Sequence, residues 1–213
     1  TPNFLNNIAG RITSILMNVL LVRLGGETAV SVYGILMYAE GFIQPLLYGM
    51  CDSLQPAVGY NLGAGKYSRV RAIEKCCYIA SAVVSLLAMV IIFLLPAQIA
   101  GLFTTDRNGE LMDIAGAALR IFSLTYLTRW FSFATQSYML AIEKPVPASL
   151  ISISTALIFP VVLVVVLWSL GLTGLWMNSG AAAVLAGILS AAVLLREHKN
   201  MMRPDAAETI QSR

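Results

Sequence analysis

The sequence predicts an all-α, polytopic membrane protein with six transmembrane helices. Hydrophobic residues make up 58% of the 213 residues and charged residues only 12%, whereas a soluble domain has about 25% charged residues. Six apolar stretches are each long enough to cross a bilayer, which takes about 20 residues. These stretches are continuous rather than alternating, so helices, and not the strands of a barrel, satisfy the backbone within the hydrocarbon.

Short polar or glycine- and proline-containing segments separate the expected helices. Gly25-Gly26-Glu27 ends the first helix, Gly63 to Lys66 ends the second, and Glu143-Lys144-Pro145 ends the fourth. The second, third and fourth stretches exceed the bilayer thickness, so they are expected to tilt, kink or protrude. The six helices cover about residues 4–24, 28–63, 70–103, 109–142, 146–170 and 173–196. Residues 1–196 thus form one transmembrane lobe, and residues 197–213 a polar tail.

Basic residues predict the orientation in the membrane. Nine of them flank one side and only two, Arg23 and Arg107, flank the other. The rule that basic loops stay inside places both ends of the segment, and the tail, in the cytoplasm. The nine are Lys66, Arg69, Arg71, Lys75, Lys144, Arg196, Lys199, Arg203 and Arg213.

The second helix carries a polar face. Glu40, Gln44, Tyr48 and Asp52 recur every four residues, and Gln55 follows, which places all five on one side of a helix. A carboxylate near the bilayer centre costs about 2.5 kcal/mol or more unless it is neutral, paired or hydrated. Two interpretations remain open: both acids line an aqueous pathway for a proton or cation, or they lie near water or pair with an arginine (Arg11 or Arg129) as structural contacts. Of the two acids, Asp52 is the preferred functional residue, because Glu40 is expected near the outer interface.

Two further polar stripes lie on the first and fourth helices. The first holds Arg11, Ser14 and Asn18, and the fourth holds Thr125, Arg129, Ser132 and Gln136. Each stripe either lines a pathway or makes hydrogen bonds between helices, which membrane helices use routinely. Aromatic and Met residues such as Tyr33, Met37 and Phe133 suit a pocket for bulky organic cations or, equally, lipid contact and packing.

Other functional classes find little support. The single histidine, His198, lies in the polar tail, and no metal-ligand spacing, catalytic motif or phosphate loop is present, so neither an enzyme nor a metal site is expected. The formal net charge of +3 is too small and dispersed to indicate nucleic-acid binding. The chain begins with Thr1 rather than Met, which suggests a fragment.

One segment carries a family resemblance. Residues 52–65, Asp-Ser-Leu-Gln-Pro-Ala-Val-Gly-Tyr-Asn-Leu-Gly-Ala-Gly, run into a basic loop at 66–71, after the turn at 24–30. This segment resembles the second helix of the carboxy-terminal lobe of MATE (multidrug and toxic-compound extrusion) transporters. The residues that carry the motif are Gln55, Pro56, Gly59, Tyr60, Asn61, Gly63 and Ala64.

The resemblance implies one lobe of a twelve-helix transporter in the cell (inner) membrane, whose partner is a missing amino-terminal lobe. Such proteins export small organic cations or drugs in exchange for H⁺ or Na⁺ as the coupling ion, with no other cofactor. Well-known branches carry coupling acids on the first and fourth helices of this lobe, where this sequence offers Arg11, Asn18, Arg129 and Gln136. Coupling therefore falls to the absent lobe or to Glu40 and Asp52. The alternatives are a lipid-linked oligosaccharide flippase of the same superfamily and a non-transporting membrane scaffold subunit.

Overall fold

The computed structural model describes the backbone of residues 2–103 and 109–201, and within these ranges all regular secondary structure is helical. The elements are α1 (Pro2–Asp52), α2 (Gln55–Gly63), α3 (Tyr67–Leu94), α4 (Pro96–Ala100), α5 (Glu110–Ser123), the 3-10 segment η1 (Leu124–Leu127), α6 (Arg129–Ala141), α7 (Pro145–Ile153), the π-helical turn η2 (Ser154–Ile158), α8 (Phe159–Val166), the 3-10 segment η3 (Trp168–Leu170) and α9 (Gly171–Met201). The fold class is therefore all-α, as the sequence predicts.

Within these ranges the chain runs back and forth through the bundle, and each pass is a candidate membrane crossing. Four helical stretches are long and apolar enough to span a membrane, and the bent pair α5–η1 and α6 makes a fifth. The first stretch, Ile8–Gly63, counts twice because α1 reverses direction at Gly26. Gly26 has φ 64° and ψ −155°, a backbone conformation open to glycine. Next to it, a Cβ on Gly25 would lie 2.8 Å from Leu172 Cδ1, so this turn packs directly against α9.

Two of the crossings are interrupted. The second crossing, the part of α1 after Gly26, stops at Asp52 and resumes as α2 at Gln55, whose next residue, Pro56, takes a first-turn position where its missing N–H is tolerated. The fourth crossing bends by 41° between α5–η1 and α6. The segment from Leu124 to Arg129 contains no proline or glycine, so the sequence gives no local signal for this bend.

The remaining crossings follow the expected ranges with shifted ends. α3 ends at Leu94 before Pro96 starts the short α4, so the third stretch is not one helix to residue 103. The fifth crossing contains the π-helical turn η2 just before Pro160. α9 continues to Met201, into the segment expected as tail, and residues 202–213 of that tail lie outside the described residues.

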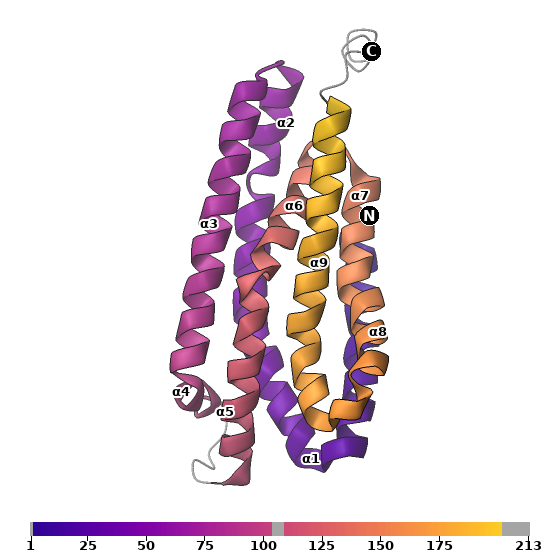
Figure 1. The fold of residues 1–213 in the computed structure, drawn as a ribbon. Coiled ribbons are helices and arrows are strands. Elements are labelled where there is room, and N and C mark those ends of the chain that lie inside the picture. Colours follow the sequence, from indigo (N-terminus) through magenta and orange to yellow (C-terminus); the bar gives the residue numbers. More distant parts are fainter. Residues whose placement is uncertain (1, 104–108, 202–213) are drawn as a thin grey trace.

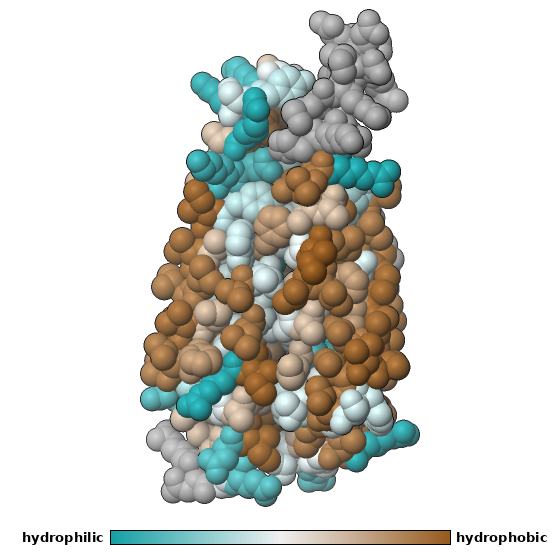
Figure 2. All heavy atoms as spheres, in the orientation of Figure 1, coloured by the Kyte–Doolittle hydropathy of each residue, from teal (hydrophilic) through white to brown (hydrophobic). Residues whose placement is uncertain are grey.

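The helices stand side by side as a bundle (Figure 1). The α2–α3 turn, the α6–α7 turn and the C-terminal end of α9 lie at one end, and the bend of α1, α4 and the α8–α9 connection lie at the other. Figure 2 shows hydrophobic side chains over the middle of one face and hydrophilic ones toward both ends. Many exposed side chains are aliphatic, such as Leu94 and Leu195, as a lipid-facing surface requires.

Candidate functional site

A polar cavity of about 370 Å³ lies between the helices, within the size range of small-molecule sites. The walls of the cavity come from several elements. They are the two limbs of α1 (the parts before and after Gly26), the α5–α6 pair, the fifth crossing (α7, η2 and α8) and α9. Its lining residues are Gly10, Arg11, Thr13, Ser14, Met17, Tyr33, Met37, Glu40, Gln44, Tyr48, Phe122, Arg129, Ser132, Phe133, Gln136, Thr155, Ala156, Pro160, Asn178, Ser179, Ala182 and Ala183.

A buried ion pair lies at the wall of this cavity. Arg129 Nη2 is 2.7 Å from Glu40 Oε1, with the two side chains 19% and 9% exposed. The Tyr126 hydroxyl donates a hydrogen bond of 2.5 Å to the other carboxylate oxygen, Oε2. Burial of a charged group is tolerated when it is paired and hydrogen-bonded, and both conditions are met for Glu40 and Arg129.

The bend of the fourth crossing positions this group. Thr128 leaves the helical conformation at φ −121°, and Arg129 starts α6 with a direction 41° from that of α5–η1. Ser85 of α3 donates a hydrogen bond of 2.7 Å to the carbonyl oxygen of Tyr126, inside the 3-10 segment. The bend therefore has its own hydrogen-bond support, and it places Tyr126 and Arg129 together against the second limb of α1.

Aromatic rings cover one side of the ion pair. Tyr48 stacks on Phe133 with ring centroids 4.2 Å apart. The guanidinium carbon of Arg129 lies 5.3 Å from the centroid of the Phe133 ring, within cation–π range. The cavity thus combines a flat aromatic wall with charged and hydroxyl groups, as pockets for amphiphilic ligands do.

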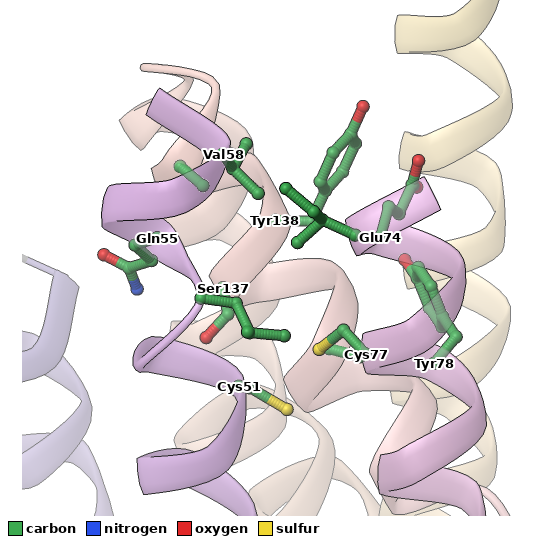
Figure 3. A pocket seen from close by; sticks show the side chains of 12 residues that line it. Cys51, Gln55, Val58, Glu74, Cys77, Tyr78, Ser137 and Tyr138 are labelled. Carbon is green, nitrogen blue, oxygen red and sulfur yellow. The ribbon is translucent and has the colours of Figure 1, made fainter. Parts of the chain in front are cut away.

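A second acidic cluster lies at the break between α1 and α2. The Ser137 hydroxyl donates a hydrogen bond to Asp52 Oδ1, and Gln55 Nε2 donates one of 2.8 Å to the same oxygen. Behind it is a small pocket of about 10 Å³, into which Cys51 of α1 and Cys77 of α3 point from opposite sides (Figure 3). Asp52 is half-buried and has no ion pair among the described residues.

The predicted site residues divide into two groups. Glu40, Gln44, Tyr48, Arg129 and Gln136 meet around the large cavity. Glu40 is 7% exposed, so it is buried among the helices. The alternative in which it pairs with Arg129 is what the structure shows.

The other predicted residues lie elsewhere. Asp52 and Gln55 form the cluster at the helix break, and Asn18 bonds the carbonyl oxygen of Ser14 outside both pockets. Of the motif residues, Gln55 to Gly63 build α2 and Ala64 caps its end, while Asn61 donates to the carbonyl oxygen of Ala57 and Tyr60 is exposed. The motif therefore shapes the end of the second crossing rather than the large cavity.

Sequence reasoning missed several partners. Tyr126, in the 3-10 segment before the bend, was not included in the predicted polar stripe, and Ser137 adjoins the predicted Gln136. Asn178 of α9 donates to the carbonyl oxygen of Pro160, and the proline in an apolar stretch was the available signal for this irregular backbone. No group of three potential metal ligands exists among the described residues.

Comparison with known proteins identifies the family. A family model described as MatE matches residues 2–166, more than half of the chain. The chain belongs to the MatE family. Curated MatE relatives include the multidrug export protein MepA of Staphylococcus aureus (strain MSSA476), which is 25% identical over 211 residues, covering 99% of this chain and 46% of MepA. The MepA protein of Staphylococcus saprophyticus is also 25% identical over the same length.

Solved structures share the fold of this MatE chain. An outward-facing multidrug resistance MATE transporter of the MOP superfamily superimposes with a TM-score of 0.83 at 19% identity, covering 92% of this chain and 44% of that one. An inward-facing structure gives 0.79 at 20% identity, with 92% and 46% covered. A MOP superfamily transporter from Pyrococcus furiosus, described as having a binding pocket of reversed polarity, gives 0.79 at 18% identity, with 90% and 44% covered. The chain spans about half the length of the proteins it matches, and membership of this family of transporters, not enzymes, places it in a membrane.

Proposed function

We propose that this lobe acts in secondary active multidrug efflux, exchanging organic cations for H⁺ or Na⁺ by alternating access against a second six-helix lobe. The cavity of about 370 Å³ carries the proposal, because it offers a polar, aromatic-walled space inside an apolar bundle. The MepA relatives are named multidrug export proteins, and similar folds occur in both outward- and inward-facing structures. A drug and an ion can drive such a cycle only when each of them binds the outward-open and the inward-open state with different affinity.

Asp52 is the proposed coupling residue within this lobe. Its carboxylate is held by two neutral donors, Ser137 and Gln55, without a described cation. It can therefore exchange a proton or Na⁺ without breaking an ion pair, whereas Glu40 cannot. The break between α1 and α2 beside it gives the helix a place to bend. Both ends of the segment, with the basic α2–α3 loop, are proposed to face the cytoplasm.

Asp52→Asn in the full-length protein tests this assignment. Asn keeps the oxygen that Ser137 and Gln55 bond, so the variant should reach the membrane at the wild-type level. Efflux of a fluorescent organic cation from cells or vesicles, driven by an imposed ion gradient, is expected to fall at least tenfold. Asp113→Asn is the matched control, because Asp113 is exposed in the first turn of α5. Wild-type efflux by Asp52→Asn would remove Asp52 from coupling.

A flippase of the same superfamily is the second candidate. Arg11 and Arg129 both line the cavity, and a pyrophosphate-linked glycolipid needs basic groups. Purified protein in vesicles separates the two candidates: a drug exporter accumulates an organic cation when the ion gradient is imposed, and a flippase moves a labelled polyprenyl pyrophosphate between leaflets. A scaffold subunit would do neither, and the polar cavity argues against it.

A further inference from the structure

The outer face of α3 divides into a basic end and a hydrophobic stretch. Arg71 and Lys75, about one turn apart near the start of the helix, are both exposed. Ile79, Val83 and Leu87 continue the same spacing of four residues, and each is more than half exposed. Every other exposed side chain from there to the end of the helix is also hydrophobic, and the two serines of this stretch are fully buried. The boundary between charge and hydrocarbon on this face therefore lies between Lys75 and Ile79.

The length of α3 places this boundary at the edge of the membrane hydrocarbon. The helix Tyr67–Leu94 has 28 residues, which at about 1.5 Å per residue gives a length of about 42 Å. The hydrocarbon of a bilayer is about 30 Å thick, so about two turns of α3 extend beyond it. With Leu94 at the far edge of the hydrocarbon, the near edge falls at Lys75. Lys75 and Arg71 then lie at the depth of the lipid phosphates.

The charge at this end of α3 is positive and uncompensated on the outer face. Arg71 and Lys75 make no ion pair with any described residue. Glu74, although it lies between them in sequence, is on the inner side of the helix, where it lines the small pocket (Figure 3). Lys66 and Arg69 are exposed close by and add two more positive charges. An anionic group in the headgroup layer is the complement of such a surface.

We propose that the outer face of α3 is a binding site for an anionic phospholipid. Arg71 and Lys75 bind the headgroup phosphate, for which a guanidinium offers paired donors and an ammonium a point charge. Ile79, Val83 and Leu87 contact one acyl chain of the same lipid. These bulky side chains fit a lipid chain better than another helix, because membrane helices approach one another through small residues. The site lies outside both pockets, so the proposal does not depend on the transport cycle.

Two phospholipids that differ in headgroup charge test the proposal. Dioleoyl phosphatidylglycerol is anionic and dioleoyl phosphatidylcholine is zwitterionic, while their acyl chains are identical. Native mass spectrometry of the purified full-length protein in detergent gives a dissociation constant for each, and the ratio of the two measures the preference for the anionic lipid. Arg71→Gln/Lys75→Gln should reduce this preference by about twentyfold, because each basic residue beside an anionic lipid contributes about fivefold.

Lys66→Gln/Arg69→Gln is the matched control. It removes two charges from the same end of α3, but Lys66 precedes the helix and Arg69 lies on a different side of it from the stripe that begins at Arg71. It should change the preference by about twofold at most, since charges that do not contact the headgroup are screened by salt. All four side chains are exposed, so both double variants should keep the wild-type thermal midpoint in the absence of added lipid.

Two results would overturn the proposal. Equal losses of preference in the two double variants would mean that phosphatidylglycerol responds to the total charge of this end and not to a site on α3. A wild-type protein that binds both lipids equally would mean that Arg71 and Lys75 do not hold a headgroup, as expected if another protein surface covers this face.

Discussion

The two interruptions of the transmembrane helices each hold a carboxylate against α6, but with different partners. At the α5–α6 bend, Glu40 faces a guanidinium and a phenol, Arg129 and Tyr126. At the α1–α2 break, Asp52 accepts hydrogen bonds from two neutral groups, the Ser137 hydroxyl and the Gln55 amide. The two acids lie on the same limb of α1, twelve residues apart in sequence.

This difference separates a structural role from a coupling role. Protonation of Glu40 has to break a buried ion pair and leave Arg129 unpaired, which is costly in a low-dielectric interior. Protonation of Asp52 leaves no charge behind, and its donors can bond a neutral carboxyl group as well. Glu40 and Asp52 lie on one helix face, but we expect a structural role for Glu40 and a coupling role for Asp52. The following substitutions test that difference.

The largest effect on the stability of the protein is expected from Arg129→Gln. It leaves Glu40 as a buried charge without its cation, and loss of one partner of such a pair costs about 3–5 kcal/mol. The thermal midpoint of the purified protein in detergent should fall by several degrees. The double variant Glu40→Gln/Arg129→Gln should recover most of the loss, because two neutral amides remain.

The control for this prediction is Arg120→Gln. Arg120 is exposed in the last turn of α5, so its loss should change the midpoint little. If the single and double cavity variants were equally unstable, the ion pair would not be what holds Glu40.

A smaller effect is expected at the other break. Ser137→Ala removes one of the two donors to Asp52 and should lower the free energy of unfolding by about 1–2 kcal/mol. The loss is measured as a decrease of the thermal midpoint in detergent, as for Arg129→Gln. Ser152→Ala is the matched control, because the buried hydroxyl of Ser152 has no hydrogen-bond partner in the structure. A loss as large as that of Arg129→Gln would contradict the distinction between the two acids.

The sequence predicted the helices better than the partners. Apolar length and the turn residues around Gly26 are local signals, and they locate most helix ends to within about five residues, the end of α3 at Leu94 being the exception. The polar face of the second crossing was likewise visible, because it depends only on helical periodicity. The pairing of Glu40 with Arg129 depends on how α1 and α6 pack, and spacing cannot distinguish Arg129 from Arg11 as partner.

The bend at Thr128 could not be predicted from local sequence patterns, and the reason is physical. Its stabilising contact is the hydroxyl of Ser85 on α3, 41 positions away from Tyr126 in the sequence, and no proline or glycine marks the site. Tyr126, which bonds Glu40, lies just before this bend, so the composition of the acidic site depends on a contact that only the tertiary structure reveals.

The smallest effect is therefore expected from Ser85→Ala. The variant removes the hydrogen bond of 2.7 Å to the Tyr126 carbonyl oxygen. Because side-chain hydrogen bonds between membrane helices average about 0.6 kcal/mol, we expect a loss of about 1 kcal/mol in the free energy of unfolding. Ser190→Ala, with no partner to lose, should cost less. Equal midpoints for the two variants in the same thermal assay would mean that the bend at Thr128 does not depend on Ser85 and is maintained by the packing of α5 and α6 against α9.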